Sequence, residues 1–289
     1  MSWRTVVIKS SSKLMYKNGY LVLRGEEMTM VHLSEISTLI IESVNVSITT
    51  SLLQELVKSK VKVIFCDDKH NPNCELIPFY GAHNTSKKVF RQIDWDEWFK
   101  KKIWTDIIYQ KIINQAGLLH YLRKNESELL FQYAQDIDYF DTTNREGHAA
   151  KVYFNALFGK GFSREDVNEI NAALDYGYSI ILSTFNKEIC ANGYLTQLGI
   201  KHINEYNYFN LSSDLMEPFR IVIDKFVYEN MEKSFDMDYK HKIIDLLNMQ
   251  IEYNGKVRYL NNIIPIYVKS VFNSIESKDS KELKLFLYP

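Results

Sequence analysis

Four side chains of types that can bind metals or transfer protons lie in stretches of sequence that suggest a functional site. Glu146 lies near the start of the stretch 144–159, His202 ends a glycine-bracketed stretch, and Asp214 and Glu217 lie three residues apart. Together they offer one imidazole and two or three carboxylates, a ligand set that suits Mg²⁺ or Mn²⁺. The first hypothesis for chemistry is therefore a divalent-cation site.

Glu146 continues an apolar helix face. At helical spacing it shares that face with Ala149, Tyr153 and Leu157. A lone buried carboxylate is costly, so such a residue usually binds a cation, pairs with a base or stays protonated. The alternative is structural: Glu146 lies in the first turn after an Asn144 cap, where an acid suits the helix dipole.

The other three candidates also have structural alternatives. His202 follows a loop bracketed by Gly193 and Gly199, and a histidine in a loop is often only a surface residue. Asp214 and Glu217 are neighbours if they lie on one helix, but Asp214 can also cap that helix with Glu217 reaching back to it. Taken singly, none of the three establishes a metal site.

Basic side chains accompany these candidates in the sequence. Arg145, Lys201 and Arg220 each stand next to or near one of them. They can neutralise the acids or hold phosphate oxygens near a metal. Spacing cannot choose between these roles, because residues so far apart in the sequence meet only in the fold.

Composition limits the classes of protein. The chain has 289 residues, 46% hydrophobic and 25% charged, with a formal net charge of −1, as expected for a globular protein of about two domains. Without a bulk positive charge, contact with nucleic acid must come from local patches.

The first residues do not read as a secretory signal and no apolar run is long enough for a bilayer, so we expect a cytoplasmic protein without membrane contact. Phosphate-loop, dinucleotide-fold and HExxH patterns are missing, which leaves nucleotide hydrolysis and zinc proteolysis without support.

The elements that must position these residues fall into two parts, which predicts an α+β fold. Residues 1–75 read as a small β-rich domain: an Asn18-Gly19 turn predicts a hairpin, 4–9, 38–42 and 61–65 read as strands, and 50–60 has helical spacing. Pro72 and Pro78 flank a segment that we interpret as the connector ending the β part. We expect a linker over 76–93.

Residues 94–289 are predicted to form a larger all-α domain that carries the catalytic residues. Acids at 94–97 precede an apolar stripe that continues to Ile112. The further predicted helices span 165–190, 211–231, 241–251 and 262–275. The apolar tail 283–289 is expected to form a strand, to dock on a partner or to pack on its own domain.

With these motifs in order, the chain resembles a known family, the CRISPR-associated adaptation integrase, which is the larger of the two universal spacer-acquisition proteins. The resemblance is to the bacterial type II (II-A-like) variety and covers essentially the whole length. The motifs that carry it are Glu146-Gly147-His148-Ala149-Ala150 with Tyr153, Asn171 through Asp175-Tyr176-Gly177-Tyr178, Gly199-x-x-His202, and Asp214-Leu215-Met216-Glu217-Pro218-Phe219-Arg220. Two positions depart from the family pattern: Thr196 stands where a proline is frequent and Asp175 where Asn is frequent. Both departures bear on the assignment of the subtype more than on the expected activity.

The resemblance implies a site and a reaction. Its metal ligands would be Glu146, His202 and Glu217, which would also be the catalytic residues, with Asp214 as an additional acid and Mg²⁺ or Mn²⁺ as the cofactor. The 3′-hydroxyl of a short foreign DNA fragment would attack a phosphodiester at the edge of a CRISPR repeat, a transesterification used in antiviral defence. The nucleophile would belong to the DNA, so no serine or cysteine needs activation.

The resemblance also implies partners. These are a second copy of the chain held through the β-rich domain, the small universal adaptation protein, the double-stranded DNA fragment and the CRISPR leader-repeat, and in type II systems the RNA-guided nuclease and an accessory adaptation protein. The candidate DNA contacts are Lys87, Lys88, Arg91, Arg145, Lys201 and Arg220, with Tyr16 and Tyr20 as stacking residues. For Lys87, Lys88 and Arg91, solvated surface charge is the simpler interpretation.

Two other functions use the same residues. The first is a metal-dependent nuclease that cuts DNA without joining it. The second is a non-catalytic DNA-binding scaffold, in which Glu146, His202 and Glu217 are structural.

Overall fold

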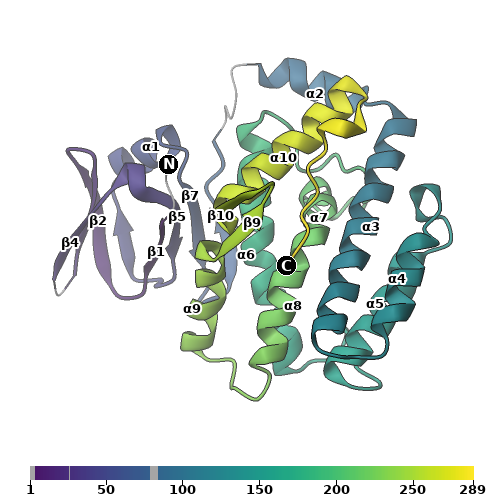
Figure 1. Ribbon diagram of the computed structural model, residues 1–289. Coiled ribbons are helices and arrows are strands. Elements are labelled where there is room, and N and C mark those ends of the chain that lie inside the picture. The colour runs from purple at the N-terminus through teal and green to yellow at the C-terminus, as the bar shows by residue number, and fades with distance from the viewer. Residues whose placement is uncertain (1–3, 26, 79–83) are drawn as a thin grey trace.

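The protein has a β-rich part and a helical part that lie side by side. The computed structural model describes residues 4–25, 27–78 and 84–289. Figure 1 shows the N-terminal strands at one side of the molecule and helices α3, α4 and α5 at the other. The expected order, a β-rich N-terminal domain followed by a larger helical one, is confirmed.

Two four-stranded sheets form the N-terminal part, in the orders β1-β5-β7-β8 and β4-β3-β2-β6. A single α-helix, α1 (Thr50–Lys58), lies between β6 and β7 in the chain. The strands are β1 (Arg4–Ile8), β2 (Ser12–Lys17), β3 (Tyr20–Arg24), β4 (Met28–His32), β5 (Ile36–Ile41), β6 (Val46–Ile48), β7 (Lys62–Cys66) and β8 (Pro72–Glu75).

Strand β5 joins the two parts of the molecule. It pairs in parallel with β1 and β7, and all of its residues are buried. Leu39 and Ile41 pack into the core of the β-rich part, whereas Ile40 packs into the core of the helical part. A strand buried on both faces explains the continuous apolar run in this segment.

The local β predictions are confirmed except at one strand. Asn18 and Gly19 both have positive φ in the turn that joins β2 and β3, as a two-residue hairpin turn requires. The interpretation of the segment between Pro72 and Pro78 as a connector is wrong for its first residues, and Pro72 is part of a strand. It begins β8, which pairs antiparallel to β7, because a proline is tolerated at the first residue of a strand at a sheet edge.

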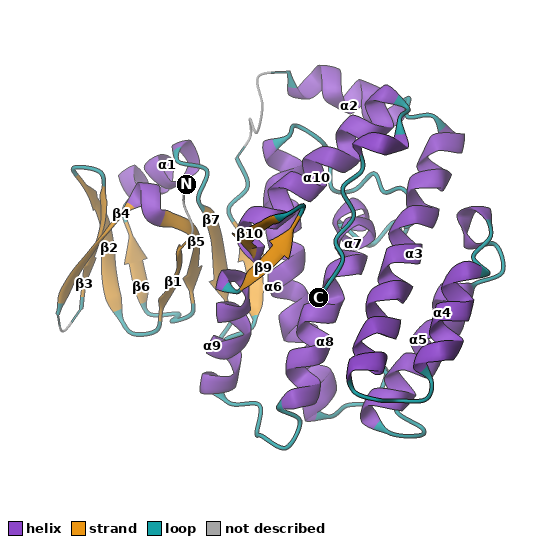
Figure 2. Ribbon diagram, in the orientation of Figure 1, coloured by secondary structure: helices purple, strands orange, loops and turns teal. Residues whose placement is uncertain are grey.

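The helical part is built around two long helices (Figure 2). Helix α3 (Glu97–Tyr121) begins at the Asp96 cap, and α6 (Glu169–Ala191) begins at the Asn168 cap, each cap accepting a backbone N–H in the first turn. The other α-helices are α2 (Thr85–Ile93), α4 (Ser127–Gln135), α5 (Arg145–Phe158), α7 (Asn210–Met216), α8 (Arg220–Glu229), α9 (Met237–Asp245) and α10 (Leu260–Ser277). The predicted linker 76–93 contains α2, and its residues 79–83 lie outside the described ones.

Two predicted helices have different limits from those expected. The segment 211–231 is not one helix, because a 3₁₀ turn, η3 (Glu217–Phe219), separates α7 from α8 at Pro218, whose ring removes a backbone N–H. The helix predicted over 241–251 ends at Asp245. It is followed by a short hairpin, β9 (Gln250–Tyr253) and β10 (Lys256–Tyr259).

The C-terminal tail packs on its own domain. Phe286 is fully buried and its ring stacks on Phe219 with centroids 4.0 Å apart. Asn114 of α3 donates from Nδ2 to the carbonyl oxygen of Phe286 at 2.9 Å. Within the described residues, no helix combines the length and hydropathy needed to cross a membrane.

Candidate functional site

Two of the predicted acids meet at one basic side chain. Lys111 Nζ of α3 lies 2.6 Å from Glu146 Oε1 of α5 and 2.6 Å from Glu217 Oε2 of η3. The two carboxylates therefore approach one position from different elements. We call these three residues the acid–lysine cluster.

The start of α5 directs Glu146 into this cluster. Asn144 occupies the expected N-cap position, with Glu146 in the first turn, but its backbone is left-handed, with φ 54°, and its side chain makes no cap bond. Asp141 caps the helix instead, because its carboxylate accepts the backbone N–H of Arg145 at 2.7 Å and of Glu146 at 3.0 Å. The Glu146 side chain is therefore left to pair with Lys111.

Glu217 is buried between two cations. Arg220 Nε donates to Glu217 Oε1 at 2.9 Å, while Oε2 forms the ion pair with Lys111 but has no hydrogen-bond donor in proper alignment. Burial alone would raise the pKa of Glu217, but Arg220 and Lys111 lower it to about 2. Burial would likewise lower the pKa of Lys111, and Glu146 and Glu217 raise it above its ordinary value. The capping-box interpretation of Glu217 is wrong.

Asp214 binds a loop instead of capping a helix. Its carboxylate accepts the backbone N–H groups of Ile200 at 2.5 Å, Lys201 at 3.0 Å and His202 at 3.1 Å. It is fully buried and lies inside α7, which begins at Asn210. A side chain at Gly199 would bring its Cβ within 2.7 Å of Asp214 Oδ2 and 2.3 Å of the His202 carbonyl oxygen. Only glycine allows this close approach.

His202 is oriented by the same carboxylate. Its Nδ1 lies 2.6 Å from Asp214 Oδ1, which leaves Nε2 as the ring nitrogen for a ligand. The Asp214 hydrogen bond raises the pKa of His202, against the effect of partial burial, and the charges of Glu217 and Glu146 add to the rise. His202 therefore lies within electrostatic reach of both acids of the cluster.

The donor set fits a divalent cation by its chemistry. Two carboxylates already share one cation position, at Lys111 Nζ, and the imidazole of His202 is oriented by Asp214 and feels the charge of both acids. Among the described residues, however, no group of three or more His, Cys, Asp or Glu side chains is arranged to hold a metal. The assignment of Glu146, His202 and Glu217 as metal ligands stays a prediction.

Two groups of residues at this site were not predicted from the sequence. Lys111 shares an apolar face of α3 with Ile107 and Ile108, both fully buried. A charged residue on an apolar helix face is the signal by which Glu146 was found, and it could have identified Lys111 as well. Asp224 of α8 is also buried, and it accepts hydrogen bonds from the hydroxyls of Tyr153, at 3.0 Å, and Tyr178. Burial raises the pKa of Asp224 to about 6, although both tyrosine hydrogen bonds lower it.

Three of the predicted DNA contacts lie at or near the cluster. Arg220 lies 4.4 Å from the Tyr178 ring centroid while it holds Glu217. Lys201 Nζ lies 3.9 Å from the Phe140 ring centroid, and the Arg145 guanidinium lies 5.4 Å from that of Tyr133. Each of these basic groups therefore lies against an aromatic ring, and each contacts a candidate ligand or is its neighbour in the sequence.

The remaining predicted contacts lie on other elements. On α2, Lys87 is exposed, Lys88 Nζ lies 4.7 Å from the Tyr194 ring centroid, and Arg91 pairs with Glu276 at 3.4 Å. Tyr16 and Tyr20 lie on β2 and β3, at the opposite side of the molecule from α3 and α5 (Figure 2). A role for any of them in DNA binding stays a prediction.

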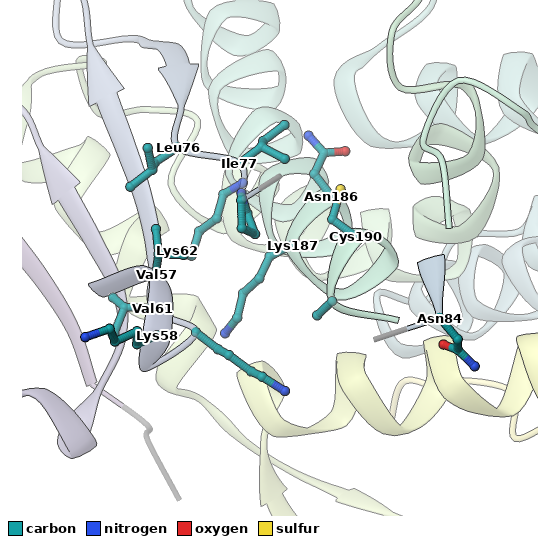
Figure 3. A pocket seen from close by; sticks show the side chains of 13 residues that line it. Val57, Lys58, Val61, Lys62, Leu76, Ile77, Asn84, Asn186, Lys187 and Cys190 are labelled. Carbon is teal, nitrogen blue, oxygen red and sulfur yellow. The ribbon is translucent and has the colours of Figure 1, made fainter. Parts of the chain in front are cut away.

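A cavity of about 900 Å³ lies apart from these residues, between the β-rich part and α6. Figure 3 shows Lys62 and Leu76 on one side of it and Asn186 and Lys187 on the other. The described residues that line it include none of the predicted site residues. The acid–lysine cluster is therefore the better candidate for chemistry.

The chain is similar to named proteins over most of its length. A family model described as CRISPR associated protein Cas1 matches residues 5–242. A "CRISPR-associated endonuclease Cas1" from Neisseria meningitidis serogroup C (strain 8013) is 32% identical over 99% of this chain and 96% of its own length. Another, from Francisella tularensis subsp. novicida (strain U112), is 27% identical over 86% of this chain and 88% of its own length.

Solved structures show the same fold. A "Casposase bound to integration product" has a TM-score of 0.77 at 18% identity, covering 100% of this chain and 96% of that one. A chain of a "Cas6-RT-Cas1--Cas2 complex" has a TM-score of 0.74 at 18% identity, covering 99% of this chain but only 36% of that longer chain. At such identities these similarities establish the fold alone. Together with the family model and the Neisseria relative, they lead to one conclusion: the chain belongs to the CRISPR-associated protein Cas1 family.

Proposed function

We propose that this chain is the catalytic subunit of a metal-dependent DNA integrase that inserts short foreign DNA fragments into a CRISPR array. The main support for the proposal is that the carboxylates of Glu146, from α5, and Glu217, from η3, approach the same cation position, which Lys111 Nζ occupies. The names of the relatives, endonuclease and casposase, support chemistry on a DNA phosphodiester.

Glu146, Glu217 and His202 would hold Mg²⁺ or Mn²⁺, with Asp214 behind the histidine. When bound, the metal would promote formation of the attacking alkoxide and stabilise charge on the phosphate. Asp214 holds the loop at Ile200–His202 through three backbone amides and fixes the ring of His202. This positions the imidazole without using its Nε2.

The basic residues support binding of the phosphate. Arg220 is held by Glu217 and the Tyr178 ring, so its remaining guanidinium donors have a fixed direction. Charge that grows on a phosphate during transfer is stabilised by such preorganised cations. The attacking hydroxyl belongs to the DNA fragment, so the protein needs to supply position and charge only.

The proposed partners follow the family. They are double-stranded DNA with a CRISPR leader-repeat, a second copy of the chain and the small adaptation protein, with the RNA-guided nuclease and its accessory protein if the chain is of type II. The presence of a Cas1–Cas2 complex among the structural neighbours supports the small partner. Action on a CRISPR array implies a cytoplasmic bacterial protein.

Strand joining tests the proposal. The protein and its small partner are incubated with Mn²⁺, a repeat-bearing plasmid, and fragments with either a free or a blocked 3′-hydroxyl. We expect joining only with the free hydroxyl, and a loss of at least about a hundredfold in E146A, while E165Q, at an exposed glutamate, joins like the wild type.

Two outcomes would favour the alternatives. Equal nicking of the plasmid with both fragments would indicate a nuclease that cuts without joining. Unchanged joining by a folded E146A variant would reject the metal site at Glu146. The joining activity would then have to come from the small partner, with this chain as a DNA-binding scaffold.

A further inference from the structure

Lys111 occupies the position where the two candidate metal ligands meet. Its ammonium is 2.6 Å from one oxygen of Glu146 and 2.6 Å from one oxygen of Glu217. The side chains of Lys111 and Glu217 are 11% and 5% exposed, so water screens this contact weakly. The ammonium is thus the counter-charge that lets two acids approach each other in the protein interior.

The backbone of Lys111 is anchored to the same element that carries Glu217. Asn114, one turn further along α3, donates from Nδ2 to the carbonyl oxygens of Pro218 and Phe286, each at 2.9 Å. Its Oδ1 accepts from Gln110 Nε2 at 2.9 Å and from the backbone N–H of Tyr288 at 3.1 Å. The main chain at Lys111 therefore stays fixed relative to Glu217, and only the flexible lysine side chain can move away.

The second cation of the cluster is held differently. Arg220 binds the other oxygen of Glu217, Oε1, and lies against the Tyr178 ring. It does not stand between Glu217 and Glu146, so a metal can share Glu217 with it through the remaining oxygen. Lys111, in contrast, bridges the two oxygens that a shared metal needs.

An ammonium and a divalent cation repel each other strongly at contact distance in a buried site. A metal that binds both carboxylates must therefore displace the Lys111 head group. We propose that Lys111 is a positioning residue that holds Glu146 and Glu217 together in the metal-free protein and competes with the divalent cation for them. This inference rests on the proposed function, because it takes the acid–lysine cluster as the metal site.

Binding of Mn²⁺ to the full-length protein tests this role, with free Mn²⁺ measured by electron paramagnetic resonance. K111M removes the competing charge and leaves two repelling carboxylates, so we expect its Kd for Mn²⁺ to fall about tenfold. K111R keeps the charge and should stay within about threefold of the wild type. K101M is the matched control on α3, because Lys101 lies over the Phe140 ring instead of on an acid, and its Kd should not change.

Thermal unfolding supplies a second measurement. In chelator, K111M should unfold at a lower temperature than the wild type, and saturating Mn²⁺ should raise its Tm by more than it raises that of the wild type. K111Q is measured in parallel, in case K111M does not fold without metal. Its amide is neutral but can still donate to one carboxylate. If Lys111 served only for packing, K111M would lower the Tm without tightening Mn²⁺ binding.

The outcomes separate this inference from the proposed function. Unchanged or weaker Mn²⁺ binding in both folded variants, K111M and K111Q, would overturn the role of Lys111 alone. Wild-type binding that E146Q and E217Q leave unaffected would overturn the metal site, and with it both proposals. Tighter binding in the neutral variants, lost again when E217Q is added, is the result that we expect.

Discussion

Asp214 and Glu217 are buried acids three residues apart in one bent helical segment, but they bind different kinds of partner. Asp214 accepts three backbone N–H groups of the Ile200–His202 loop and the ring of His202. Glu217 pairs with two side-chain cations, Lys111 and Arg220. Backbone donors cannot leave without unfolding the loop, whereas a lysine head group can move.

This difference assigns separate roles to the two acids. A carboxylate whose oxygens are taken by backbone amides has a structural role and orients the histidine. A carboxylate held by exchangeable cations can accept a metal in their place. The sequence pattern Asp-x-x-Glu treats the two acids alike, and only the contacts distinguish them.

The largest expected effect is the loss of Asp214. D214A leaves three backbone N–H groups without acceptors, so we expect the free energy of unfolding to fall by about 4 kcal/mol. Denaturant unfolding measures this, and hydrogen exchange should show faster exchange of the amides of Ile200, Lys201 and His202.

E217Q is the matched comparison, because it removes the neighbouring charge and keeps the loop contacts. Those three amides should stay protected in E217Q. Equal exchange in both variants would contradict the separate roles of the two acids.

A smaller effect is expected in acid. The cations beside Glu217 hold its pKa at about 2, below its ordinary 4.5, so the ionised form stabilises the fold above pH 4.5 and this contribution is lost as the pH falls towards 2. The stability difference between the wild type and E217Q should therefore shrink by about 2 kcal/mol from about pH 5 to about pH 3. Urea unfolding across this range measures it, and a constant difference would show that the cations do not stabilise ionised Glu217.

Local patterns predicted the order of the fold. The Asn18-Gly19 turn, the apolar run of β5 and the 3.6-residue period of α3 each reflect interactions within a few residues or one buried face. The same Asn-Gly signal stands at Asn254-Gly255, where β9 and β10 form a hairpin. No hairpin was predicted there, although the flanking apolar residues alternate with polar ones as in a strand.

The site was predictable only as a set of candidates. Glu146 was found as an acid on an apolar face and Glu217 as a neighbour of Asp214, but the meeting of Glu146 and Glu217 at Lys111 depends on how α3 packs against α5 and η3. The role of Asp214 depends on a loop that folds back over α7. Contacts between elements so distant in sequence leave no signal in local spacing, so the ligand assignment came from the family resemblance.

Anomalous diffraction from crystals of the protein grown with Mn²⁺ shows whether the three candidate ligands share one ion. We expect one Mn²⁺ bound by Glu146, Glu217 and His202, with the Lys111 ammonium withdrawn and Asp214 still accepting the three loop amides. An ion bound to Asp214 with the loop released, or an unchanged acid–lysine cluster at saturating Mn²⁺, would contradict this expectation.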